Sequence, residues 1–222
     1  MTPADPPLHH RYAEGDPRSP VLLLLHGTGG TPEDIAVLGR ELDPTATLLA
    51  PAGRVSENGA ARWFRRHAEG VFDEEDVRQR VEELADFVLW AREHYGLSGR
   101  RTVAVGFSNG ANIAAATMLA RPEVLAEGVL FAAMLPLGQP PEVPPVGGRV
   151  WMSNGTRDPM APLASVERLV EAFRANGVEV TSERHPGGHG ITPESLREAA
   201  RWLRRPTGRS GARSSPSPGP QQ

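Results

Sequence analysis

The chain has 222 residues and a formal net charge of −3, a length that suits one α/β domain and a charge that predicts no general attraction to nucleic acid or to anionic membranes. It contains no cysteine and no lysine, which excludes disulfides, thiolate metal sites, a cysteine nucleophile, Schiff-base chemistry and serine–lysine dyads. The polar, proline-rich residues 1–16 lack an apolar signal-peptide core and no apolar run approaches transmembrane length, so we expect a cytoplasmic protein.

The first predicted elements are a strand and a helix joined by a glycine-rich loop. Residues 20–27, PVLLLLHG, form a continuous apolar run closed by glycine, which predicts a central strand covered on both faces. In the following TPEDIAVLGREL, Thr31 is a typical N-cap, Pro32 suits the first helical position, and acidic residues occupy the first turn. The order is therefore strand, glycine loop, helix.

A second strand and the longest helix come next. Residues 45–51, TATLLAP, predict a short strand, and a glycine-containing loop follows it. The amphipathic segment FDEEDVRQRVEELADFVLWAREHYG predicts a long helix that Asp73 caps and Gly96 ends. Thr102 to Phe107 is again short, apolar and β-branched, and Ala111 to Leu119 is rich in helix formers.

The second half of the chain repeats the alternation of strands and helices. It predicts strands at residues 127–136, 148–156 and 178–185, and helices at residues 162–177 and 192–203. Such alternation is typical of an α/β protein whose mostly parallel central sheet carries helices on both faces. We expect this domain to span residues 1–204 and residues 205–222, which lack apolar residues, to form a disordered tail.

Ser108 lies at the predicted junction of a strand and a helix. Gly106 and Gly110 flank it in the pattern G-x-S-x-G, and the strand-turn-helix context is that of a nucleophile elbow. The alternative is an ordinary loop serine. A nucleophilic role also requires a base, an acid and an oxyanion site elsewhere in the chain.

Asp158 and His189 follow Ser108 in the order serine, acid, histidine. Each comes directly after a predicted strand, and the carboxyl ends of parallel strands meet at one edge of a sheet. The alternatives are a turn or capping aspartate and a surface-loop histidine. A metal site at His185 and His189 is not expected, because loop residues four apart do not share a helix face.

Two main-chain N–H groups are candidates for the oxyanion site. Asn109 follows the serine, and Thr28 lies in HGTGG after the first predicted strand, where glycines permit close approach to a ligand. A phosphate-binding loop is the alternative, yet neither G-x-x-x-x-G-K-[ST] nor G-x-G-x-x-G is present there. His26 precedes this loop and is expected to brace it.

Four ordered motifs, LLHGTGG, GFSNGAN, GTRDP and GGHGI, resemble the phospholipase/carboxylesterase family of α/β-hydrolases. The stretches around them resemble its bacterial subgroup of carboxylesterases associated with methylhydroquinone resistance. The resemblance implies Ser108 as nucleophile, His189 as base and Asp158 as acid, with Thr28 and Asn109 as oxyanion donors. The acyl-thioesterase branch differs, having Gln at the position of Asn109 and Asp at the position of Arg65.

We therefore expect a single-domain α/β-hydrolase fold without a large cap, acting as a serine carboxylesterase on small carboxylic esters. No cofactor, metal, nucleic acid or membrane partner is expected, and a homodimer is compatible with the sequence. The alternative activities are those of an acyl-thioesterase or lysophospholipase on the same triad. A catalytically inactive hydrolase fold used for binding is the alternative outside enzymes.

Trp63, Phe64, Arg65 and Met160 are the candidate substrate contacts. For the aromatic residues and Met160, packing in the core is the alternative. In RWFRR, residues 62–66, an arginine at the edge of the sheet would bind a substrate carboxylate, and Arg65 is the first choice because it replaces the Asp of the thioesterase branch. Surface ion pairs with Glu57, Glu69 or the acids at 73–76 are the alternative.

Overall fold

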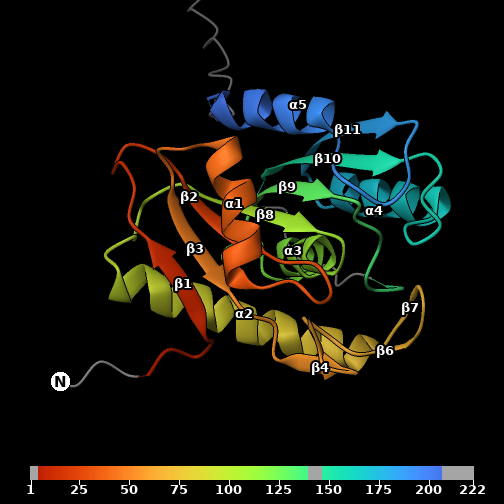
Figure 1. The fold of residues 1–222 in the computed structure, drawn as a ribbon, viewed down its shortest axis with the longest axis horizontal. Helices are drawn as coiled ribbons and strands as arrows, with labels where there is room; N and C mark the ends of the chain where they lie inside the picture. The colour runs from red at the N-terminus through yellow and green to blue at the C-terminus, as the bar shows by residue number, and fades with distance from the viewer. Residues whose placement is uncertain (1–4, 140–146, 207–222) are drawn as a thin grey trace, which may run out of the picture.

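A computed structural model describes residues 5–139 and 147–206, which are built around a seven-stranded sheet (Figure 1). The strand order is β1-β3-β2-β8-β9-β10-β11, in which β1 is antiparallel to β3 and every other neighbouring pair is parallel. These strands are β1 (His10–Ala13), β2 (Val21–Leu25), β3 (Thr47–Pro51), β8 (Thr102–Phe107), β9 (Glu127–Phe131), β10 (Arg149–Gly155) and β11 (Glu179–His185).

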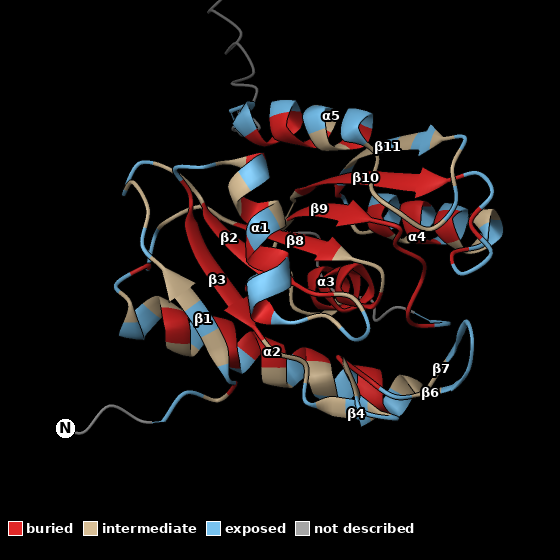
Figure 2. Ribbon diagram, viewed as in Figure 1, coloured by how far each residue is buried: buried red, intermediate tan, exposed pale blue. Residues whose placement is uncertain are grey.

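Helices cover both faces of the sheet, as predicted. The helices are α1 (Pro32–Leu42), α2 (Glu74–His94), α3 (Asn109–Ala120), α4 (Leu163–Ala175) and α5 (Pro193–Arg204). Along β2, Leu22 and Leu24 pack in a core cluster with residues of α1 and α5, whereas Leu23 and Leu25 pack in a second cluster with residues of α2, α3 and α4. The central strands are therefore buried on both faces (Figure 2).

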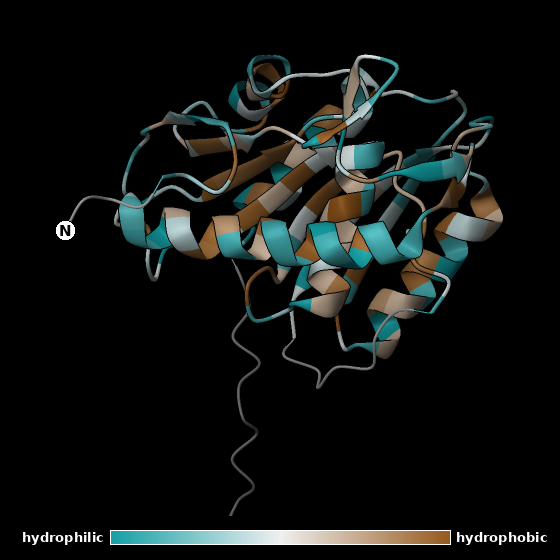
Figure 3. Ribbon diagram, turned by 90° about the horizontal axis from the view of Figure 1, so that it is seen from below, coloured by the Kyte–Doolittle hydropathy of each residue, from teal (hydrophilic) through white to brown (hydrophobic). Residues whose placement is uncertain are grey.

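The helix ends agree with the expected caps. Thr31 and Asp34 form a capping box at the start of α1, and Asp73 accepts a hydrogen bond from the main-chain N–H of Asp76 at 3.1 Å. Gly96 adopts a φ of +63° just after α2. Figure 3 shows α2 crossing the front of the molecule with mainly hydrophilic residues outward. Its apolar face lies on the opposite side and packs against the sheet.

Four features of the fold differ from the prediction, the first being that β9 ends at Phe131 although a strand was predicted over residues 127–136. The edge strand β1 was not expected, and the predicted loop after β3 contains two small hairpins. The first joins β4 (Val55–Glu57) to β5 (Ala60–Arg62), and the second joins β6 (Arg66–Ala68) to β7 (Val71–Phe72). Among the described residues no large cap domain is inserted. The two hairpins lie beside the carboxyl edge of the sheet.

The described part of the chain continues to residue 206, two residues past the predicted domain boundary at residue 204. The main-chain carbonyl of Arg205 accepts a hydrogen bond from Arg149 Nη2 at 2.9 Å, so Arg205 is still attached to the domain. The remainder of the predicted tail, residues 207–222, lies outside the described residues. Within the described part of the chain, every helix is too short or too polar to cross a membrane.

Candidate active site

Ser108 occupies a strained turn between β8 and α3. Its φ of 53° and ψ of −119° lie outside the ordinary regions for an L-residue. A Cβ at Gly106 would lie 2.6 Å from Ala111 Cα, and one at Gly110 would lie 2.0 Å from the Leu25 carbonyl oxygen. The two glycines therefore allow helix α3 to start directly against the ends of β8 and β2, which is what the G-x-S-x-G spacing predicted.

His189 and Asp158 continue a chain of hydrogen bonds from this serine. His189 Nε2 lies 2.8 Å from Ser108 Oγ, and His189 Nδ1 lies 2.7 Å from Asp158 Oδ2. The buried Asp158 carboxylate also accepts main-chain N–H bonds from Met160 at 2.8 Å and Ala161 at 3.2 Å. With Nδ1 protonated, the imidazole presents its free Nε2 lone pair to the serine hydroxyl, which is the arrangement that makes a serine nucleophilic.

The loops that carry Asp158 and His189 are tied to each other. The N–H of Thr156 donates to the His185 carbonyl at 2.8 Å, and the N–H of Arg157 donates to the Gly187 carbonyl at 3.0 Å. A Cβ at Gly155 would lie 2.3 Å from the Gly188 carbonyl oxygen, so a glycine is needed for this close approach. Acid and imidazole are therefore positioned by adjacent strands, β10 and β11, and by direct contact between their loops.

The two expected oxyanion donors are free. Thr28 and Asn109 both line the cavity at Ser108, and their main-chain N–H groups donate to no acceptor within residues 5–139 and 147–206. Arg62 Nη1 holds the Thr28 side chain by a 3.0 Å hydrogen bond to its hydroxyl oxygen. Two unused N–H groups beside a serine hydroxyl can receive the negative charge of a tetrahedral intermediate.

His26 braces the loop that carries Thr28. Its Nδ1 lies 2.7 Å from the Gly27 carbonyl, its Nε2 accepts the N–H of Gly53 at 3.0 Å, and its carbonyl accepts the indole N–H of Trp63 at 2.9 Å. Burial lowers the pKa of His26 from its ordinary value, which keeps the ring neutral and its Nε2 an acceptor. These three contacts give His26 the bracing role that the sequence predicted for it.

The structure corrects three of the four predicted substrate contacts. Met160 lines the cavity, but Trp63 and Phe64 are buried in the core and Arg65 lies outside the lining. Trp63 is fixed because its main-chain N–H donates a hydrogen bond to Asn109 Oδ1 at 2.7 Å. Arg62 and Arg66, on either side, line the cavity instead.

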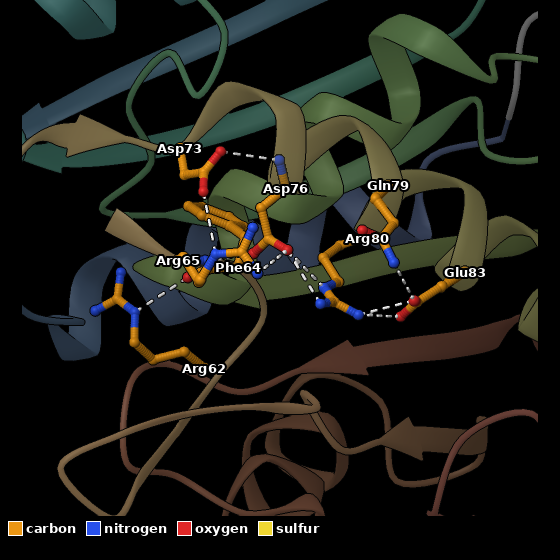
Figure 4. A network of polar contacts seen from close by, with 8 residues as sticks. All are labelled: Arg62, Phe64, Arg65, Asp73, Asp76, Gln79, Arg80 and Glu83. Carbon is orange, nitrogen blue, oxygen red and sulfur yellow. Dashed lines mark hydrogen bonds and ion pairs between the residues drawn. The ribbon is translucent and has the colours of Figure 1, made fainter. Parts of the chain in front are cut away.

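Arg65 is turned toward helix α2 (Figure 4). Its main-chain N–H donates a hydrogen bond to Asp76 Oδ2 at 2.6 Å. Its guanidinium forms ion pairs with Asp73 and Asp76 at 3.1 Å and 3.3 Å. The ion-pair alternative is therefore correct for Arg65, and this arginine anchors the segment rather than meeting a substrate.

The described residues contain no group of three or more His, Asp or Glu side chains placed to hold a metal ion. His185 Nδ1 instead accepts the N–H of Gly187 at 3.2 Å, within its own loop.

A sequence model of the phospholipase/carboxylesterase family matches residues 12–206. The chain belongs to this family. It is 39% identical over 198 residues to the putative hydrolase MhqD of Bacillus subtilis (strain 168), covering 89% of this chain and 98% of that protein. The carboxylesterase of Bacillus cereus superposes with a TM-score of 0.83 at 38% identity, covering 88% of this chain and 93% of that one. The chain thus has the predicted α/β-hydrolase fold and is an ester hydrolase.

A further structure, YahD with malic acid, superposes with a TM-score of 0.83 at 25% identity, covering 88% of this chain and 98% of that one.

Proposed function

We propose that this protein is a serine carboxylesterase in which Ser108, His189 and Asp158 form the catalytic triad. The observation that carries the proposal is the unbroken hydrogen-bonded chain from Ser108 Oγ through the His189 ring to Asp158, at 2.8 Å and 2.7 Å. It opens into a cavity that the serine and the histidine line together.

In the first half of the reaction, His189 Nε2 takes the proton of Ser108 as the serine oxygen adds to the ester carbonyl. Asp158 stabilises the imidazolium that forms. The N–H groups of Thr28 and Asn109 receive the charge on the carbonyl oxygen, and His189 then returns its proton to the departing alcohol. Water hydrolyses the acyl-enzyme by the same steps, with His189 as base and then as acid.

The proposed substrate is short. Polar and charged side chains, among them Arg62, Asn109 and Asn112, make up much of the wall of the cavity at Ser108, which suits a small polar ester better than a long apolar acyl chain. That YahD has been solved with malic acid, a four-carbon compound, is in keeping with a small ligand. Esters and thioesters of graded chain length, assayed side by side, will distinguish a short-chain esterase from a thioesterase or lysophospholipase.

The test of the triad is Ser108→Ala, with Ser98→Ala as a matched control on an exposed loop. We expect Ser108→Ala to lower kcat for p-nitrophenyl acetate by at least about 10⁴-fold, because the nucleophile is lost, while Ser98→Ala matches the wild type. A fluorophosphonate should add to the wild type and to Ser98→Ala only, as measured by intact mass. Folded Ser108→Ala protein, checked by circular dichroism, that retains near-native turnover would contradict the proposal.

A further inference from the structure

Arg62 enters the wall of the cavity at Ser108 with part of its guanidinium unused. Its side chain is 3% exposed and lines the cavity beside Thr28. Nε donates to the Phe64 carbonyl at 3.3 Å, and Nη1 contacts Thr28 Oγ1 at 3.0 Å and Glu57 Oε2 at 3.3 Å. Nη2 has no hydrogen-bond partner among the residues that the structure describes, so two N–H donors remain for a ligand.

Two asparagines in the same wall also have side-chain N–H groups without an acceptor among the described residues. Asn109 Oδ1 accepts the N–H of Trp63 at 2.7 Å, and Asn112 Oδ1 accepts the N–H of Met134 at 2.9 Å. Because main-chain donors fix both carbonyl oxygens, each side chain offers only its NH₂ group to anything else. The described residues supply no acceptor for either group. Asn109 Nδ2 is completely buried, so of the two only the amide of Asn112 can reach a ligand in the cavity.

Arg62 and Arg66 are paired with two carboxylates, Glu57 and Glu69, so the formal charges balance, but the contact of Arg62 is the longer of the two with Glu57. The carboxylate partner of Arg62, Glu57, is shared with Arg66, which lies closer at 2.9 Å. Glu69, the acidic residue of the lining, is 53% exposed and paired with Arg66. Burial lowers the pKa of Arg62 from its ordinary value, but a guanidinium stays charged at neutral pH. Donors in a cavity wall that lack a protein acceptor favour a ligand that supplies acceptor oxygens, and a charged carboxylate makes the strongest such bonds.

We propose that this wall binds a carboxylate of the substrate, and that the preferred substrate is a short ester that also carries a free acid group. The carboxylate accepts hydrogen bonds from Arg62 Nη2 and from the amide group of Asn112. This inference rests on the proposed esterase function, because it places the acid group beside the serine that attacks the ester. A neutral ester of the same size offers these donors only an uncharged carbonyl oxygen, which is a weaker acceptor than a carboxylate.

The first experiment compares a half-ester with its neutral diester. We expect kcat/KM for monomethyl succinate to exceed that for dimethyl succinate by at least about tenfold, the scale of one charge-assisted contact. Acetoxyacetate against its methyl ester places the acid on the alcohol side of the scissile bond, and whichever pair shows the preference identifies the side that meets Arg62. If in both pairs the neutral ester has the same kcat/KM as the ester that carries a free acid group, the inference is overturned while the esterase function stands.

The decisive variant is Asn112→Asp. One carboxylate oxygen can still accept the N–H of Met134, while the other replaces the NH₂ donor with a negative charge in the cavity wall. The ratio of half-ester to diester kcat/KM should fall at least about tenfold. Arg65→Gln is the matched control, since it removes a positive charge from the same segment outside the cavity, and its ratio should equal that of the wild type. Equal losses in both variants overturn the inference.

A binding measurement keeps the two proposals separate. Calorimetry with the Ser108→Ala protein should show that succinate binds, that succinamide does not, and that Asn112→Asp added to this background weakens succinate binding at least about tenfold. If the wild type hydrolyses no ester, the esterase proposal fails while these titrations still decide the carboxylate site. Absence of succinate binding to the folded protein overturns the site.

Discussion

Single residues show which parts of the candidate site can be predicted from sequence. The strained φ of Ser108 follows from two glycines within two residues of it, so a local pattern contains the information. The directions of Arg62 and Arg65 do not follow from local sequence. They depend on Asn109 and Asp76, which bind the N–H groups of Trp63 and Arg65 from 46 and 11 residues away.

Asn112 was not identified from the sequence for the same reason. In GFSNGAN it is one more polar residue on a predicted helix, and only the contact with Met134 shows that its carbonyl oxygen is already used. An asparagine next to a predicted elbow is the one signal that was available.

His26 leads to a prediction on the pH dependence of stability. Burial lowers its pKa in the native state below the ordinary value of 6.5, so the unfolded chain binds more protons as the pH falls through 6.5. Stability should therefore be complete above this pH and decline below it, by at most about 1.4 kcal/mol per pH unit from this group. Urea denaturation between about pH 7 and about pH 5 measures the decline.

The comparison for that experiment is His26→Gln, whose amide oxygen can accept the N–H of Gly53 without titrating. Its curve of unfolding free energy against pH should be flatter than that of the wild type over this interval. Parallel curves would show that His26 contributes nothing to the acid response.

At the scale of elements, the two hairpins between β3 and α2 decide which side chains reach the cavity. Their turns contain Asn58-Gly59, both at positive φ, and Gly70 at a φ of +71°. An Asn-Gly pair is the strongest short-range signal for a hairpin, so β4 and β5 were predictable from the sequence. The prediction for this segment was a glycine-containing loop, and the structure has the two hairpins instead.

The hairpins are anchored to α2 through Asp76, which gives a second prediction. This fully buried carboxylate accepts the N–H of Arg65 and pairs with Arg80 at 3.0 Å (Figure 4). Asp76→Ala should lower the free energy of unfolding by about 1–3 kcal/mol, because it leaves the main-chain N–H of Arg65 without an acceptor and removes one of the two carboxylates that pair with Arg80. Chemical denaturation followed by circular dichroism measures the loss.

Glu83→Ala is the matched control, since Glu83 pairs with the same Arg80 at 2.7 Å but is partly exposed. Its cost should stay within about 1 kcal/mol, as for other solvent-accessible pairs. Similar losses in the two variants would show that burial of Asp76 has no special energetic weight.

For the whole molecule, the alternation of strands and helices was enough to predict the sheet and its two helical layers. The antiparallel edge strand β1 was beyond sequence reasoning, because HRYA is short and only partly buried, and its pairing with β3 is a long-range contact. Short edge strands have no clear alternation of apolar and polar residues by which to be recognised.

A truncation after Pro206 tests where the cooperative unit ends. Residues 207–222 offer no large apolar side chain to bury, so their removal should leave kcat/KM unchanged and Tm within about 2 °C of the full chain. Differential scanning calorimetry on both forms measures this. A Tm lower by several degrees would mean that this segment contributes to the folded state.

The close approach of α3 to β2 also determines how the site could be blocked. In the proposed mechanism the N–H groups of Thr28 and Asn109 receive the negative charge, and the packing of Gly110 against the Leu25 carbonyl fixes the start of α3, where Asn109 lies. A boronic acid becomes a tetrahedral anion when a serine oxygen adds to its boron, and such mimics of a transition state bind far more tightly than substrates. A carboxylate linked to the boron would also meet Arg62 in the proposed acid-binding wall, so a short carboxy-alkyl boronate is the inhibitor that the two proposals together predict.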